Sequence, residues 1–211
     1  MHTHFRIRGF TLVELLVAIT LVIVLAALSF LGLSKWKSKA GAATSMIRVK
    51  SIGMLVMTYA TEKGELPVWH DYNRGMYWWQ LLIEDQEKPD LEQFHSPAHR
   101  EFDEKNMANT ISYGWNYPVI GRHKGDGGYR GDHVLRLSNF DYPEDTLVLA
   151  DGPRDYCWGF IDPWNNKPDP ERYEGKAAAL FLDGAVRMLD TPREFTATSK
   201  WFKPVRPLLP R

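Results

Sequence analysis

The longest run of apolar residues lies near the start of the chain, at residues 10–33. It holds 24 residues with no proline and one ionisable side chain, Glu14. As an α-helix it would be roughly 36 Å long, and the hydrocarbon core of a bilayer is about 30 Å thick. A secretory signal peptide fits less well, because its apolar region is usually shorter and ends at a small-residue cleavage site. The pattern therefore predicts a transmembrane helix over residues 10–33.

Beyond this run, apolar residues recur at steps of three and four, which is typical of an amphipathic helix. These positions are Met46, Val49, Ile52, Val56 and Tyr59. No proline occurs between residue 10 and Pro67, and Gly64 just ahead of it is a helix stop signal. The helix is therefore predicted to continue over residues 34–63, with Gly41 and Gly53 as weak points that cost about 1 kcal/mol each relative to alanine.

Residues 64–199 are predicted to form a small α+β head. A short helix is expected near Tyr77, and apolar patterning predicts strands over residues 133–140 and 146–150. Three prolines after residue 199 indicate an extended tail over residues 200–211.

The clearest short-range signal is a β-hairpin near the end of the head. Apolar runs at residues 177–182 and 185–189 flank the dipeptide Asp183-Gly184. A two-residue type I′ turn needs positive φ at both positions, and Asp-Gly suits it. We therefore expect a small antiparallel sheet laid against the amphipathic half of the helix.

Composition bounds the class of protein. The chain has 211 residues and a mass of 24.3 kDa, enough for one ordinary domain plus an appendage. Its 26 basic and 26 acidic residues balance, which argues against a general nucleic-acid binder, and no specific nucleic-acid partner is predicted. The single cysteine, Cys157, excludes an intramolecular disulfide and a multi-cysteine metal site.

The start of the apolar run carries a specific motif. The segment from Arg8 to Glu14 reads Arg-Gly-Phe-Thr-Leu-Val-Glu, and it resembles the processing site of type IV pilins and type II secretion pseudopilins. The resemblance implies that a prepilin peptidase cleaves between Gly9 and Phe10 on the cytoplasmic face and N-methylates Phe10. It also implies that Glu14 faces the Phe10 amine of a neighbouring subunit.

Physical chemistry is consistent with these roles. Gly9 has no side chain, so a protease can approach the backbone closely. A carboxylate and an ammonium are both costly in lipid, and pairing Glu14 with the Phe10 amine offsets part of that cost. Such a pair would set the axial register of stacked helices. The alternative is that Glu14 merely reaches toward the membrane interface.

The charges after the apolar run oppose this orientation. Lys35, Lys37, Lys39, Arg48 and Lys50 follow it, so a count of positive charges would place the C-terminal side in the cytoplasm. We give the motif precedence, because leader processing requires a cytoplasmic N-terminus and large domains translocate largely regardless of charge. These lysines are interpreted as contacts for anionic lipid headgroups or for acidic faces of neighbouring subunits.

A second resemblance concerns the head. Residues 113–117, the strand at residues 147–151 and the Asp183-Gly184 hairpin resemble a group of pilin-like proteins in planctomycete and verrucomicrobial bacteria. That group is often marked by a histidine, nine residues and then Asp-Gly. Here the histidine position holds Tyr173, so the match is partial.

Candidate chemistry in the head is weak. The histidines, His70, His95, His99, His123 and His133, show no metal-ligand or catalytic spacing, and are interpreted as ordinary loop histidines. Calcium is a low-ranking cofactor hypothesis, with Asp126, Asp132 and Asp151 as candidate ligands, because carboxylate oxygens suit that ion. Turn-forming aspartates are the simpler explanation.

Tryptophans are unusually frequent, with eight in the chain, all after the apolar run. Seven of them could form a sugar-stacking surface, but such residues more often form a small domain's core and its subunit contacts. The seven are Trp69, Trp78, Trp79, Trp115, Trp158, Trp164 and Trp201. We favour the core interpretation.

Taken together, the sequence predicts an α+β, pilin-like subunit of a type II secretion pseudopilus or a type IV pilus-like filament, and no enzyme. Its expected partners are prepilin peptidase, copies of itself, other pilin-like subunits and an inner-membrane assembly platform. Its expected location is the bacterial inner membrane, with residues 1–9 as a cytoplasmic leader and the head in the periplasm. The alternatives are a monomeric membrane-anchored envelope or glycan-binding protein and a tethered hydrolase that uses the histidine and aspartate loops.

Overall fold

The computed structural model describes residues 11–125, 134–154 and 158–203, without the side chains of residues 29–34. Several predicted features lie outside these residues: the leader 1–9 with Gly9, Phe10, the candidate ligands Asp126 and Asp132, Cys157 and the tail from residue 204. The chain divides into two units, Met1–Lys39 and Ala40–Arg211. Each unit is described by itself below.

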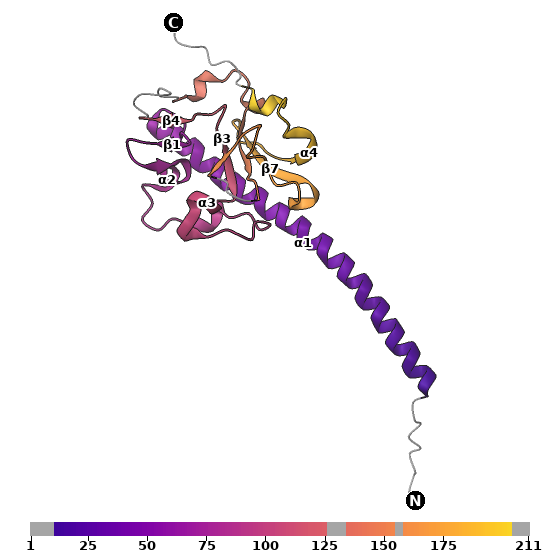
Figure 1. Ribbon diagram of the computed structural model, residues 1–211. Coiled ribbons are helices and arrows are strands. Elements are labelled where there is room, and N and C mark those ends of the chain that lie inside the picture. Colours follow the sequence, from indigo (N-terminus) through magenta and orange to yellow (C-terminus); the bar gives the residue numbers. More distant parts are fainter. Residues whose placement is uncertain (1–10, 126–133, 155–157, 204–211) are drawn as a thin grey trace, which may run out of the picture. The chain divides into compact units, whose positions relative to one another are not determined.

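One helix, α1, runs from Leu12 to Lys63 (52 residues), which confirms the long N-terminal helix (Figure 1). It ends at Gly64, whose φ of 71° lies in the left-handed region that glycine adopts without strain. Gly53 inside the helix has a packing role, because a Cβ there would lie 2.7 Å from Leu180 Cδ1. Glycine at this position therefore allows the helix to approach the sheet closely.

The main sheet has five strands in the order β6-β3-β5-β7-β8. Their bounds are β3 Tyr113–Asn116, β5 Leu147–Asp151, β6 Phe160–Ile161, β7 Lys176–Phe181 and β8 Val186–Asp190. Neighbours pair antiparallel except β3 and β6, which are parallel. The sheet is therefore mixed, whereas the sequence had indicated an antiparallel one.

A second, three-stranded sheet has the order β2-β1-β4. It consists of β1 His70–Asp71, β2 Met76–Tyr77 and β4 His123–Lys124. β1 pairs antiparallel with β2 and parallel with β4. This small sheet has no counterpart in the sequence prediction, because strands of two residues are too short to show a hydrophobic period.

Short helices fill the connections. The α-helices are α2 Trp78–Ile83, α3 Met107–Thr110 and α4 Thr191–Glu194. The 3₁₀ helices are η1 Leu91–Phe94, η2 Glu104–Asn106, η3 Leu137–Asn139, η4 Pro143–Asp145, η5 Arg172–Glu174 and η6 Lys200–Phe202. The helix expected near Tyr77 is confirmed by α2.

The strand predicted over residues 133–140 is wrong for its described part. Leu137–Asn139 forms η3 instead, and the Asn139 side chain accepts a hydrogen bond from the Arg136 backbone N–H at 2.7 Å. Local side-chain bonding of this kind offers the backbone an alternative to a sheet.

The predicted hairpin is confirmed, but its turn differs. Leu180 pairs with Val186, and the Gly184 N–H donates to Phe181 O at 2.9 Å. Gly184 has φ of 81°, whereas Asp183 is not in the left-handed region. The loop is therefore a type I turn followed by a glycine bulge, not the expected type I′ turn.

Hydrophobic side chains pack on both faces of the main sheet. Strand β7 shows this by alternation, because Ala178 and Leu180 join one cluster while Ala179 and Phe181 join the other. The first cluster contains Val49, Ile52 and Val56 of α1 with Trp78 and Trp115, and the second contains Leu147, Phe181, Leu189, Phe195, Trp201 and Phe202. The fold is thus α+β, with the second half of α1 covering one face of a mixed sheet in a pilin-like arrangement.

Candidate functional site

The first described turn of α1 is closed by a capping box. Glu14 Oε2 accepts from the Thr11 backbone N–H at 2.9 Å and from Thr11 Oγ1 at 2.8 Å, while Glu14 N donates back to Thr11 Oγ1 at 3.3 Å. In this arrangement Thr11 is the N-cap and Glu14 is the third helical residue, and the side chain of each accepts from the free backbone N–H of the other. The structure thus gives Glu14 a local role that the sequence analysis did not assign.

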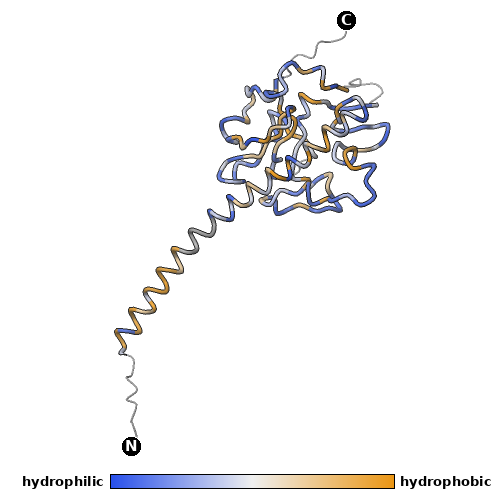
Figure 2. The backbone as a smooth tube through the Cα atoms, turned by 180° about the vertical axis from the view of Figure 1, so that it is seen from behind, coloured by the Kyte–Doolittle hydropathy of each residue, from blue (hydrophilic) through white to orange (hydrophobic). Residues whose placement is uncertain are grey.

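The apolar side chains in the N-terminal part of α1 are largely exposed. Every large apolar side chain described from Leu12 to Leu28 is at least half exposed, with values from 51% at Val17 to 84% at Leu12. Figure 2 shows this part of α1 as a continuous hydrophobic stretch. Contiguous apolar surface of this extent indicates contact with lipid or with other protein.

The predicted span over residues 10–33 falls partly outside the described residues, at Phe10 and at the side chains of residues 29–33. Within the part of the chain that the structure describes, no helix meets the length and hydropathy needed to cross a membrane.

In the second unit, α1 has two opposite faces. Val49, Ile52 and Val56 are at most 1% exposed against the sheet. The opposite side of the helix carries exposed apolar residues at steps of four, seven and three, which places them along one stripe. They are Ala43, Ile47, Met54 and Met57. Ile47 is 68% exposed and Met54 is 58% exposed. We call these four residues the exposed stripe. It is an apolar helix surface that the head leaves uncovered.

A buried polar network ties α1 to the sheet. Ser45 of α1 lies 3.1 Å from the Tyr113 hydroxyl of β3 and donates to Asp151 Oδ1 of β5 at 3.4 Å. Asp151 is fully buried, and its Oδ2 accepts from the Ala178 N–H at 2.7 Å. The bonds therefore fix one side of the helix at a defined level on the sheet.

Arg172 of η5 completes this network. Its Nη1 lies 3.4 Å from Asp151 Oδ1 and donates to Ser112 O at 3.1 Å, while Nη2 donates to Pro153 O at 3.2 Å. Burial raises the pKa of Asp151, and the Arg172 guanidinium opposes that rise. This pair could not be predicted from the sequence, because Asp151 and Arg172 lie 21 positions apart and belong to no motif.

Tyr173 lies ten residues before Asp183, where the pilin-like group marked by histidine, nine residues and Asp-Gly often has its histidine. It is 7% exposed with φ of 46°, and its hydroxyl lies 2.7 Å from Ser96 Oγ. Its ring packs on α1, since a Cβ at Gly41 would lie 3.2 Å from Tyr173 Cε1. In this chain the position therefore serves helix packing.

Two basic residues of α1 bind the head directly. Arg48 Nη2 pairs with Glu92 at 3.0 Å, and its Nη1 donates to His95 O at 2.5 Å. Lys50 donates to Gly184 O in the β7–β8 loop at 2.6 Å. Both positively charged side chains therefore have acceptors within the second unit.

The described histidines lie in two pairs and are structurally engaged: His70 pairs with His123 across β1 and β4, and His95 Nε2 lies 2.9 Å from His99 O. His99 is 5% exposed and bonds Ser112 Oγ at 2.9 Å, and burial lowers its pKa to about 4. His95 stacks on Phe102 with ring centroids 4.6 Å apart. A cavity of about 300 Å³ brings His99 together with the loop aspartate Asp169 and with Arg172. The hydrolase alternative would need at least three histidine or aspartate groups in one cleft, and this cavity is lined by two.

Calcium coordination finds little support at the one described candidate. Both Asp151 oxygens are occupied by the network above, and the described residues contain no group of three or more His, Cys, Asp or Glu able to hold a metal ion. Asp162, another loop aspartate, caps its own turn: it accepts from the backbone of Trp164, Asn165 and Asn166.

Most of the described head tryptophans lie in the core, as we favoured. Trp78 and Trp115 are 0% exposed and Trp79 is 3% exposed. The exposed ones are Trp158 at 46% and Trp164 at 63%, so a sugar-stacking surface built from all seven residues is not present.

Comparison with known proteins gives one match. Residues 4–30 match the family model described as prokaryotic N-terminal methylation motif. No curated protein and no solved structure matches the chain. The matched region includes Gly9, Phe10, Thr11 and Glu14.

This motif marks the precursors that prepilin peptidase cleaves and methylates. Residues 4–30 of the chain thus carry the N-terminal motif of the type IV pilin and pseudopilin family. The motif implies a membrane-anchored envelope protein, and subunits of this family are generally structural rather than enzymatic.

Proposed function

We propose that the chain is a structural subunit of a type II secretion pseudopilus or a type IV pilus-like filament. The peptidase cleaves between Gly9 and Phe10, methylates Phe10 and leaves a mature chain that begins at Phe10. The segment 10–33 then holds the subunit in the bacterial inner membrane, with the head in the periplasm, until an assembly platform extracts it. Copies of the chain and other pilin-like subunits are its partners in the filament.

The observation that carries this proposal is the apolar first part of α1. Its large apolar side chains from Leu12 to Leu28 are at least half exposed, and they lie within the matched methylation motif. A lipid bilayer before assembly and neighbouring helices after assembly would each cover them. The exposed stripe supports the same conclusion, because it gives the second half of α1 an apolar face suited to another helix.

Glu14 sets the register in this proposal. Its carboxylate already holds the first turn of its own helix through Thr11. After cleavage the Phe10 amine directly precedes that turn, so a neighbouring subunit displaced along the filament axis could bring its amine to the carboxylate. An ammonium paired with a carboxylate in an apolar environment is favoured over either charge alone.

The test is the intact mass of the native protein extracted from membranes, combined with N-terminal peptide sequencing. A chain that begins at N-methylated Phe10 supports the proposal. A chain that begins at Met1, or that is cut after the apolar run, contradicts it. Cleavage at Gly9 without sedimentable filaments would favour the alternative of a monomeric envelope-binding protein.

A further inference from the structure

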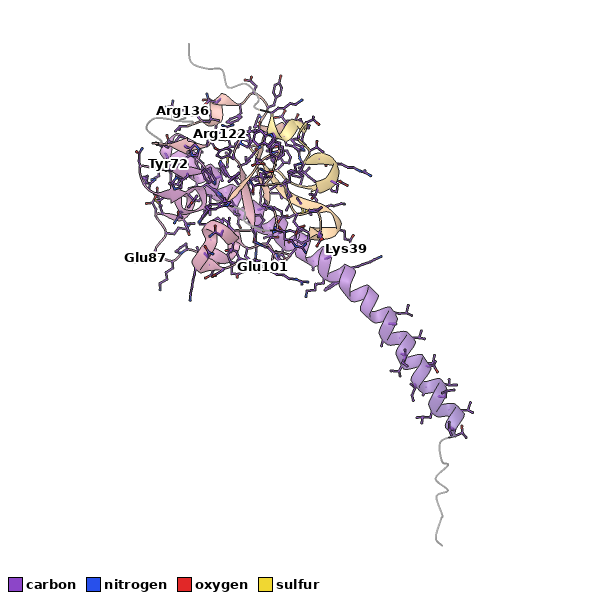
Figure 3. All side chains as sticks on the ribbon, in the orientation of Figure 1. Lys39, Tyr72, Glu87, Glu101, Arg122 and Arg136 are labelled. Carbon is purple, nitrogen blue, oxygen red and sulfur yellow. The ribbon has the colours of Figure 1, made fainter. Side chains whose placement is uncertain are left out.

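A group of basic side chains follows the apolar part of α1 directly. Lys35, Lys37 and Lys39 are exposed, and Trp36 among them is 75% exposed. Figure 3 shows Lys39 extending away from the helix. We call these four residues the lysine collar. Unlike Arg48 and Lys50, its three lysines make no ion pair or hydrogen bond within the described part of the chain.

The lysines of the collar lie on two opposite sides of the helix instead of on one face. Successive residues of an α-helix are rotated by about 100°, so Lys37 lies about 200° from Lys35, while Lys39 returns to the side of Lys35. The three lysines span roughly 6 Å of helix axis. A protein that packs on one side would meet part of this charge, whereas a layer of headgroups around the helix would meet all of it.

The level of the collar along the helix agrees with this. Lys35 follows Glu14 by 21 residues, which is roughly 32 Å of helix, close to the thickness of about 30 Å of a hydrocarbon core. Tryptophan is enriched at membrane interfaces, and lysine stems lie along apolar surface while the ammonium reaches water. A helix that spans from Glu14 would therefore place the collar among the headgroups on the side of the head.

We propose that the lysine collar binds the phosphodiester headgroups of anionic phospholipids in the leaflet next to the head. This inference rests on the proposed membrane anchor. The positive charge of Lys35, Lys37 and Lys39 would by itself favour a cytoplasmic head, against the orientation that leader processing requires. The proposal gives these lysines a role that is compatible with a periplasmic head. Bound lipid would hold the subunit at a fixed depth, and it would have to be released when the helix is extracted into a filament.

The experiment uses the full chain reconstituted in phosphatidylcholine vesicles that carry spin-labelled phosphatidylglycerol or, in a parallel sample, spin-labelled phosphatidylcholine. The fraction of label immobilised beside the protein gives the preference for the anionic lipid. The test variant replaces Lys35, Lys37 and Lys39 with Gln. The matched control replaces three exposed lysines of the second unit, Lys88, Lys105 and Lys203, with Gln and so changes the net charge equally.

We expect the unmodified chain and the control to prefer phosphatidylglycerol by roughly tenfold. The preference should fall to near one in the collar variant, and it should weaken in the unmodified chain at about 0.5 M salt because salt screens exposed charges. A chain that floats with the vesicles but shows no preference overturns the inference alone, as does a collar variant that keeps the preference. A chain that fails to float with vesicles overturns the proposed anchor and the inference together.

Discussion

At the residue scale, Glu14 combines two roles that a single substitution to alanine would confuse. Its carboxylate closes the capping box with Thr11, and it is proposed to pair with the Phe10 amine of a neighbour. Glutamine also serves at this position of a capping box, but it carries no charge. Glu14→Gln therefore separates the local role from the intersubunit one.

We expect both Glu14→Gln and Glu14→Ala to lower filament yield by about tenfold or more, because either leaves the buried amine unpaired. Cleavage at Gly9 should continue in both variants. Sedimented filaments and the mass of the mature chain are the two measurements, and Thr11→Ser, which keeps the cap, is the control. Normal filament yield in Glu14→Gln would restrict Glu14 to its capping role.

His99 predicts how the stability of the head depends on pH. Burial lowers its folded-state pKa to about 4, whereas an unfolded histidine titrates near 6.5. The unfolded chain therefore binds the extra proton first as pH falls, so stability is full above about 6.5 and is lost toward 4. We expect a loss of up to about 3 kcal/mol from this residue over that window.

The measurement is urea unfolding of the full chain, followed by tryptophan fluorescence, at several pH values from 7 downward. His99→Gln should flatten the dependence. Burial raises the pKa of Asp151, so Asp151 has the opposite sign and favours the fold more as it becomes protonated. Because that effect is present in both proteins, the difference between them isolates His99. Parallel curves for the two would show that His99 does not carry the effect.

At the element scale, Gly53 tests how closely α1 approaches the sheet. A methyl group there would lie 2.7 Å from Leu180 Cδ1. Gly53→Ala gains about 1 kcal/mol of helix propensity, but overpacking a core costs about 1–3 kcal/mol. We expect a net loss of roughly 1 kcal/mol in urea unfolding. In a Leu180→Ala background, which frees the space, the same change should become neutral or stabilising.

The β7–β8 turn distinguishes the observed hairpin from the predicted one. Gly184 has φ of 81°, so Gly184→Ala should destabilise the head by about 1 kcal/mol. Asp183 Oδ1 accepts from the Ala185 N–H at 2.9 Å. Asp183→Gly would therefore also destabilise this turn, whereas it would suit a type I′ turn. A gain in thermal stability for Asp183→Gly would contradict the observed turn.

These elements also show what a sequence can predict. Helix α1, strand β5 and the β7–β8 pairing follow from local hydrophobic period and turn residues, and all three are observed. The strand expected near Leu137 failed because side chain to backbone bonding formed a 3₁₀ turn there. The predicted type I′ turn was wrong because the length of the β7–β8 loop depends on strand register, and the dipeptide Asp183-Gly184 alone does not fix that register.

At the scale of the whole molecule, the motif was readable because its residues are consecutive. The Ser45, Asp151 and Arg172 network was not, because its members are brought together by α1, β5 and η5. Buried polar networks depend on tertiary geometry and leave no periodic signal in the chain. The exposed stripe lies between these cases: its spacing is helical, but the structure is needed to show which apolar face the head leaves uncovered.

The exposed stripe gives the last prediction. Ile47 and Met54 make no part of the buried core, so Ile47→Gln and Met54→Gln should change head stability by no more than about 0.5 kcal/mol. If the stripe packs against neighbouring subunits, the double variant should nevertheless lower filament yield several-fold, while cleavage at Gly9 stays normal. Thr58→Gln, an exposed polar change on the same helix, is the control. Unchanged filament yield would show that α1 assembles through its apolar first part without this face, and a loss of head stability would show that the stripe supports the head itself.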